Sequence, residues 1–174
     1  MNEVQTGASS ALFGSWRHTG VSRGLGEFQG RRPVLVTAKG EKVLALPVEG
    51  LDGRRLAEFT ALCGPVVPQL ILTERRALAL GLDASTPMAL SLSAGDGARK
   101  ILALVSNTTK DRLSAAMPAS SAAAAAIQLV KISQSLPTVL AADVVAHGVG
   151  CEESIVRVEP PLYDGKGSAC RTPV

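Results

Sequence analysis

Few residues of this sequence have side chains that could hold a metal ion or carry out catalysis. The sequence contains three cysteines and two histidines. His147, Cys151 and Cys170 could together ligate zinc, but Cys170 lies far along the chain with no paired ligand beside it. Structural zinc sites need four clustered nitrogen or sulfur ligands. We therefore expect these to be unrelated loop residues and predict no metal site.

Cys63 is the remaining cysteine and a candidate nucleophile. It ends an apolar helical segment, and no histidine lies near it in the sequence. A reactive cysteine needs a neighbour that stabilises the thiolate, whereas a cysteine in apolar surroundings behaves as a small core residue. We expect Cys63 to be a core residue and predict no catalytic cysteine.

Two segments partly match known phosphate-binding patterns. Residues 24–30, GLGEFQG, have the glycines of a dinucleotide-binding loop, but one residue too many precedes the third glycine and no strand precedes the segment. Residues 73–76, TERR, lie at a predicted strand-to-helix junction, where phosphate can bind. A capped helix start explains the same residues. We expect a helix and its cap in the first segment and a capped, solvated helix start in the second.

Composition excludes several classes of function. The chain has 174 residues, of which 46% are hydrophobic and 19% charged, as expected for one globular domain. Its net charge of +3 and 3% aromatic content argue against a nucleic-acid partner. No apolar run is long enough to span a membrane, no signal peptide is evident, and the odd cysteine count fits a reducing compartment. We expect a cytoplasmic protein with no membrane partner.

The elements that must position these residues follow from periodicity and turn residues. Helices are expected at 21–28, 54–62, 75–80 and 122–136, with caps at Asp52, Thr73 and Ser120 or Ser121. Strands are expected at 33–37, 42–47, 68–72, 88–92, 100–105 and 138–142, with one more plausible at 155–158. The first two strands should form a hairpin.

This interleaving predicts an α/β fold (α+β layered) with a single curved mixed sheet and helices packed on it. We expect a mobile leader at 1–18 and one domain at 19–150. Residues 151–174 are rich in Pro and Gly and are expected to be a tail or linker stub whose deletion leaves stability nearly unchanged.

Three segments resemble the family of 3,4-dihydroxy-2-butanone 4-phosphate synthases. Residues 26–36, GEFQGRRPVLV, resemble its opening helix and first strand. Residues 70–82, LILTERRALALGL, resemble a strand followed by its "Thr, Glu-Arg, Leu-Gly-Leu" helix, and residues 124–137 have the length and apolar rhythm of its late helix. More closely, the chain resembles the degenerate version of this domain that precedes GTP cyclohydrolase II in some bacterial riboflavin-pathway proteins.

The chain departs from this family where the resemblance places catalysis. The family has a dense acidic loop after the first strand, which binds magnesium and abstracts a proton; the matching residues 37–42, TAKGEK, hold one carboxylate, Glu41, and two lysines. The family's Gly-His-Thr-Glu-Ala motif, which binds metal and phosphate, corresponds to residues 121–125, SAAAA. Asp143 is the only matching carboxylate, where the family has a catalytic glutamate; it is expected to be an ordinary strand-end or loop residue.

Three hypotheses follow from the residues and the resemblance. The first is a catalytically inactive riboflavin-pathway domain that is structural or dimerising, with no catalytic residues, cofactor or metal of its own. It would form a homodimer, as the resemblance implies, and could partner a cyclohydrolase domain. The second is an active enzyme, either the Mg²⁺-dependent synthase acting on ribulose 5-phosphate or, joined to a zinc-containing second domain, GTP cyclohydrolase II. The third is a nucleotide- or RNA-binding module on a related fold.

Overall fold

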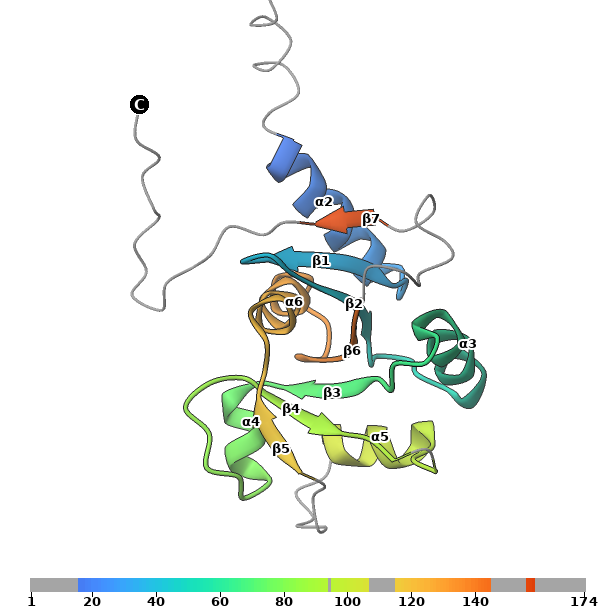
Figure 1. The fold of residues 1–174 in the computed structure, drawn as a ribbon, viewed down its shortest axis with the longest axis vertical. Coiled ribbons are helices and arrows are strands. Elements are labelled where there is room, and N and C mark those ends of the chain that lie inside the picture. Colours follow the sequence, from blue (N-terminus) through green and yellow to red (C-terminus); the bar gives the residue numbers. More distant parts are fainter. Residues whose placement is uncertain (1–15, 94, 107–114, 145–155, 159–174) are drawn as a thin grey trace, which may run out of the picture.

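The computed structural model describes residues 16–93, 95–106, 115–144 and 156–158, with side chains described from Thr19 onward. The chain forms one seven-stranded mixed sheet with helices on both faces, which confirms the predicted fold class (Figure 1). The strand order is β5-β4-β3-β6-β2-β1-β7, and every pair is antiparallel except β1 with β7. None of the described helices is long and apolar enough to cross a membrane.

The elements alternate along the chain as the sequence predicts. The helices are α2 (Trp16–Gln29), α3 (Gly53–Cys63), α4 (Glu74–Ala79), α5 (Ala98–Ser106) and α6 (Ser121–Ile132). The strands are β1 (Val34–Ala38), β2 (Glu41–Pro47), β3 (Gln69–Leu72), β4 (Met88–Ser91), β5 (Ala116–Pro118), β6 (Thr138–Asp143) and β7 (Val156–Val158). The expected caps at Asp52, Thr73 and Ser120 each accept a hydrogen bond from the backbone amide three residues on.

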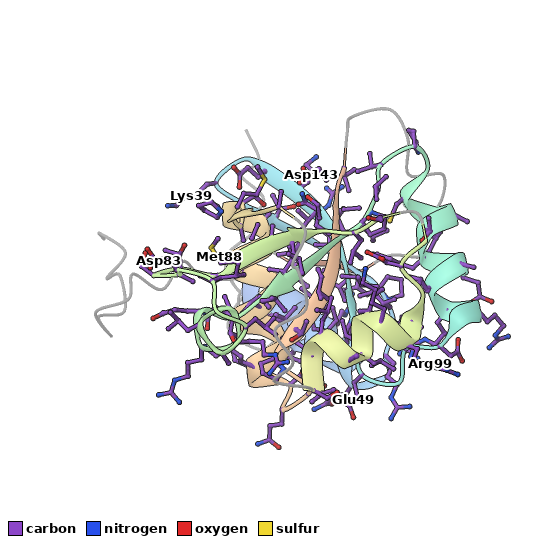
Figure 2. The ribbon with its side chains drawn as sticks, turned by 90° about the horizontal axis from the view of Figure 1, so that it is seen from below. Lys39, Glu49, Asp83, Met88, Arg99 and Asp143 are labelled. Carbon is purple, nitrogen blue, oxygen red and sulfur yellow. The ribbon has the colours of Figure 1, made fainter. Side chains whose placement is uncertain are left out.

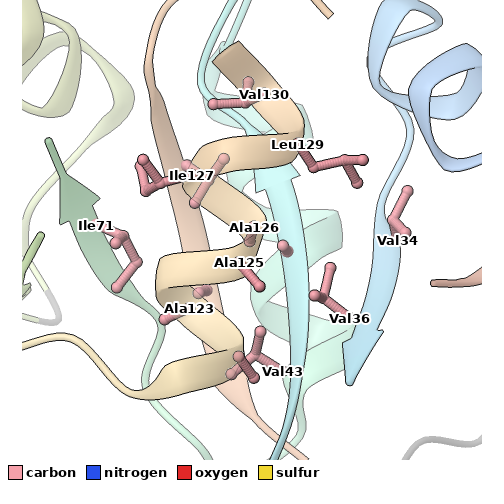
Figure 3. Packing of buried hydrophobic residues seen from close by; sticks show 14 of the residues in the cluster. Val34, Val36, Val43, Ile71, Ala123, Ala125, Ala126, Ile127, Leu129 and Val130 are labelled. Atoms are coloured by element: carbon pink, nitrogen blue, oxygen red, sulfur yellow. The ribbon is translucent and has the colours of Figure 1, made fainter. Parts of the chain in front are cut away.

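The two faces of the sheet carry side chains of different size. Helices α2 and α6 cover a face of small and β-branched residues, such as Val36, Val43 and Ala45 (Figure 3). Helices α3 and α5 cover a face of leucines, such as Leu44 and Leu46. Successive residues of a strand point to opposite faces, so the alternation in β2 places valine or alanine on one side and leucine on the other.

One expected strand is a helix. Residues 100–105 were expected to be a strand because they are almost all apolar, but they lie within α5. Ile101 and Leu104 are three residues apart and both buried against the leucine face, which is the spacing of one helix face. The backbone amides of Lys100 and Ile101 both donate to the carbonyl of Gly97 and so begin the helix. A short apolar run fits either structure, and the tertiary contacts decide.

Other boundaries differ because of local backbone geometry. Helix α2 begins at Trp16, before the expected start at 21, so the expected leader at 1–18 overlaps the helix. Helix α6 ends at Ile132, before the expected end at 136, because Gln134 adopts a φ of 59°. The short strand β5 is not predicted by the sequence pattern.

The plausible strand at 155–158, within the expected tail at 151–174, is present as β7. Val156–Val158 pairs in parallel with β1, beyond the expected domain boundary at 150. Val158 is fully buried and lies over Gly24 of α2, where a Cβ atom would come 2.3 Å from its Cγ2 and 3.4 Å from Leu129 Cδ2. Strand β7 therefore packs into a space that exists because position 24 has no side chain.

We predict that Gly24→Ala destabilises the protein even though alanine is the better helix former. Alanine in place of glycine in an exposed helix interior gains about 1 kcal/mol, but overpacking costs about 1–3 kcal/mol. Gly26→Ala is the matched control, because a Cβ at Gly26 meets nothing within 4 Å; it should stabilise. Urea unfolding of both variants measures the difference.

The same experiment in a Val158→Ala background tests the cause. Removing the γ-methyl groups leaves room for the new Cβ, so Gly24→Ala should no longer destabilise, a coupling that a double-mutant cycle measures. Equal effects of Gly24→Ala in both backgrounds would contradict the packing of β7 against α2.

Candidate functional site

Three segments meet at one end of the sheet, where the resemblance places a catalytic site. They are the turn between β1 and β2, the start of α6, and the end of β6. Ala38 pairs with Glu41 across the turn, Val43 pairs with Asp143, and the amide of Val144 donates to the carbonyl of Lys42 at 3.0 Å. Figure 2 shows Lys39 and Asp143 toward the same end of the molecule, away from Glu49.

The turn is too short to form a binding loop. Lys39 and Gly40 have φ values of 50° and 82°, as in the two-residue type I′ turns whose twist matches that of a hairpin. Glycine takes such a φ without steric cost, whereas lysine does so only at some cost. The turn therefore leads directly from β1 into β2, and Glu41 is its only carboxylate.

Glu41 is engaged by the start of α6. Its Oε2 accepts a hydrogen bond from the backbone amide of Ala122 at 3.3 Å. Ser120 Oγ accepts one from the amide of Ala123 at 3.2 Å. A helix N-terminus attracts anions because its first amides lack partners and carry partial positive charge. Here two of those amides, of Ala122 and Ala123, already donate to side-chain oxygens of the chain itself.

The groups that remain at this end do not fit a magnesium ion. Magnesium takes oxygen ligands, of which carboxylates are the usual protein contribution. Lys39 and Lys42 are exposed cations on either side of Glu41, and the first turn of α6 carries alanine side chains. Within the described part of the chain, no group of three or more His, Cys, Asp or Glu side chains is placed to hold a metal ion.

Asp143 is the last residue of β6 and is exposed. Asp143 was expected to be an ordinary strand-end or loop residue, and it lies at a strand end. The register sets it beside Val43 at the edge of the turn region. Acid–base catalysis needs a second positioned group, and Val43, the residue paired with Asp143, supplies none.

The other sequence candidates serve the fold. Gly24 and Gly26 lie inside α2, so residues 24–30 do not form a strand-to-helix loop. Thr73 caps α4, as expected. Arg76 is not simply solvated, as was expected: it is half-buried, and its Nε and Nη2 donate to the carbonyl of Leu104 at 2.9 and 2.6 Å, which ties α4 to α5. His147, Cys151 and Cys170 lie outside the described residues.

Cys63 is half-buried at the end of α3 and packs against the leucine-face cluster. Burial disfavours the charged thiolate and raises the pKa of Cys63 to about 11. This environment is the opposite of one that activates a nucleophilic cysteine. The sequence-based expectation of a core cysteine therefore agrees with its surroundings.

The comparisons with known proteins match structures only. No protein-family model matches the sequence, and no curated protein matches it. The fold is similar to a two-domain 3,4-dihydroxy-2-butanone 4-phosphate synthase from A. baumannii, with a TM-score of 0.56 and 12% identity. That match covers 80% of this chain and 55% of the other, so the chain spans about half of the two-domain enzyme.

Two further structures give the same result. A 3,4-dihydroxy-2-butanone 4-phosphate synthase of Candida albicans matches with a TM-score of 0.58 and 16% identity, over 80% of this chain and 92% of that one. Another, in complex with two magnesium ions, matches with a TM-score of 0.55 and 16% identity, over 79% and 81%. The chain has a dihydroxybutanone-phosphate synthase fold. At identities of 12–16% the similarity establishes the fold only. Any activity must be inferred from the residues of the site.

We predict that Glu41→Ala weakens the attachment of the β1–β2 turn to α6. Losing a side chain that caps a helix costs about 0.5–2 kcal/mol, so the urea midpoint should fall. Asp83→Ala, which removes an exposed carboxylate from the loop after α4, is the matched control and should have little effect. If the two variants are equally stable, the Glu41 carboxylate does not cap α6.

We also predict that Cys63 reacts slowly with iodoacetamide in the folded protein. With a pKa of about 11, the thiolate fraction at pH 8 is about one in a thousand. The rate is measured in a Cys151→Ser/Cys170→Ser variant, in which Cys63 is the remaining cysteine. The labelling rate should rise as the pH approaches 11, and it should rise sharply in urea because unfolding exposes the thiol. Rapid labelling of the folded variant at pH 8 would contradict the raised pKa.

Proposed function

We propose that this chain is a catalytically inactive domain of riboflavin biosynthesis that retains the dihydroxybutanone-phosphate synthase fold as a structural, dimerising module for a GTP cyclohydrolase II. The observation that supports inactivity best is the hydrogen bond from the Ala122 amide to Glu41. It engages the only carboxylate of the turn and a helix amide that an anion would otherwise bind.

The electrostatics of the turn support the same proposal. A magnesium-dependent enolisation needs carboxylates to hold the ion and a positioned base to take the proton. Glu41 is held by α6, and Lys39 and Lys42 repel a dication. Asp143 is left as one exposed carboxylate at a strand end. Neither magnesium binding nor proton abstraction has a complete set of groups here.

The structural role rests on the fold and on its exposed apolar side chains. Val67, Leu78, Met117, Ile132 and Leu136 are large, apolar and at least 43% exposed, and burying such side chains at a subunit contact would stabilise association. The similar A. baumannii enzyme has two domains, which agrees with a second domain in the assembly. Homodimer formation and a cyclohydrolase partner are part of the proposal.

The competing function is the synthase reaction itself, which the fold alone favours. The two functions differ in one requirement, namely that the synthase must bind magnesium at the turn. Substrate turnover therefore separates them.

We predict no Mg²⁺-dependent release of formate when the purified chain is incubated with ribulose 5-phosphate. The positive control is an active dihydroxybutanone-phosphate synthase assayed in parallel, and the negative control contains no enzyme. Magnesium should also leave the melting temperature unchanged, because a ligand raises it only by binding the folded state. Formate above the no-enzyme control, abolished by Glu41→Gln, would show that the turn is a working metal site.

The oligomeric state of the same sample is measured by sedimentation equilibrium. A dimer at the assay concentration supports the dimerising role and shows that the inactive protein is assembled. A folded monomer at that concentration would contradict the role.

A further inference from the structure

A second candidate site lies at the opposite end of the sheet. A cavity of about 360 Å³ opens between the α2–β1 connection, the end of β2 and one side of α3. Four arginines and one glutamate line it: Arg31, Arg32, Arg54, Arg55 and Glu58. Since the β1–β2 turn joins the far ends of these strands, this cavity is separate from the site described above.

Arg55 is fixed in place without a carboxylate partner. Its Nη1 donates to the carbonyls of Glu49 and Gly50 at 3.4 and 3.2 Å, and its Nη2 donates to the carbonyl of Arg31. The ion pairs of the described residues include none for Arg55. A guanidinium has five N–H donors. Arg55 therefore has donors to spare and a charge that its carbonyl partners do not neutralise.

Two glycines make room for the neighbouring guanidinium groups. A Cβ atom at Gly50, whose φ is +67°, would lie 2.8 Å from Nη1 of Arg31. A Cβ atom at Gly30 would lie 3.1 Å from the guanidinium of Arg32. Arg31 itself has a φ of 58°, which is uncommon for a residue with a side chain. The backbone at this end thus adopts conformations that let arginine side chains lie against it.

The charges around the cavity leave cations available to a ligand. Arg32 is paired with Glu27, and Arg31 lies 3.9 Å from Glu49. Arg54 and Glu58 are 3.8 Å apart with side chains 80% and 62% exposed, a pair that contributes little. Asp52 caps α3 by accepting from the amide of Arg55 at 2.8 Å. Glu27 thus holds Arg32 and Asp52 holds the helix start, whereas Arg31 and Arg54 have only long, exposed ion pairs and Arg55 has no carboxylate partner among the described residues.

We propose that this cavity binds a small aryl phosphomonoester. The phosphate lies between Arg54 and Arg55, whose planar groups match phosphate oxygens. The ring lies against the half-buried Pro33 and Leu62 on the cavity wall. The volume suits a small ligand. This binding site does not depend on the proposed function, because it needs neither magnesium nor turnover.

Phenyl phosphate is the probe, and the amide signals of the full-length chain in ¹H–¹⁵N NMR are the readout. We expect saturable shifts at residues 30–33, 54–58 and 62. Arg54→Gln should raise the dissociation constant about tenfold, which is the loss of affinity expected for one charge-assisted hydrogen bond. Arg54 is chosen because Arg55 also bonds three carbonyls. Glu58→Gln, which removes a repelling carboxylate, should tighten binding, and raising the salt should weaken it.

The matched control is Arg75→Gln, an exposed arginine of α4 outside the cavity, which should leave the affinity unchanged. An equal loss from Arg75→Gln would overturn the proposal, because it would indicate attraction to net charge alone. If phenol binds as tightly as phenyl phosphate, the arginines do not bind the phosphate. If inorganic phosphate binds as tightly as phenyl phosphate, the ring does not contact the apolar wall. Tighter binding of a short single-stranded oligonucleotide would show a nucleic-acid surface instead.

Discussion

The close packing of α6 on the sheet is the constraint on which the rest of the structure depends. Its inward residues include Ala122, Ala123 and Ala126, and the strands beneath present valine, alanine and isoleucine. Small side chains on both surfaces let the helix axis approach the sheet closely, and a close-packed interior then tolerates no added volume. This placement also brings the first amides of α6 within hydrogen-bond distance of Glu41 on the β1–β2 turn. One helix therefore connects the middle of the sheet, the hairpin and, through Leu129, the packing around Gly24 and Val158.

The same packing limits the chemistry of the hairpin end. A magnesium-dependent site there would need polar side chains at the start of α6 and several carboxylates on a longer turn. Alanines at 122–126 give a helix with high intrinsic propensity and a well-buried face, but they supply neither ligand nor proton carrier. The two-residue turn at Lys39 and Gly40 likewise gives a well-formed hairpin and removes the space for an acidic loop. Stability and catalytic competence compete for the same positions.

Local features of the fold could be predicted from the sequence, and contacts between distant segments could not. The β1–β2 hairpin and the caps at Asp52, Thr73 and Ser120 depend on neighbouring residues, so their patterns sufficed. The segment 100–105 was predicted to be a strand because an unbroken apolar run does not distinguish a strand from a helix. The burial of both Ile101 and Leu104 on one side of α5 favours the helix. The bond between Glu41 and Ala122 joins residues 81 positions apart. The sequence alone showed that residues 37–42 and 121–125 differ from the motifs of the family they resemble, but not that the Glu41 carboxylate caps a helix.

The distribution of carboxylates explains why the two ends of the sheet differ in what they can bind. Asp52 and Glu41 cap helices, Asp96 accepts from Ser93 and Lys100, and Glu27 pairs with Arg32. The pKa values of Asp96 and Glu27 are both lowered, chiefly by hydrogen bonds from Lys100 and Arg32, so these groups stay ionised and engaged. A carboxylate held in this way has fewer lone pairs left to coordinate a cation. Arginines held by backbone carbonyls, as Arg55 is, keep their charge. Such an arrangement opposes cation binding at the hairpin and favours anion binding at the other end.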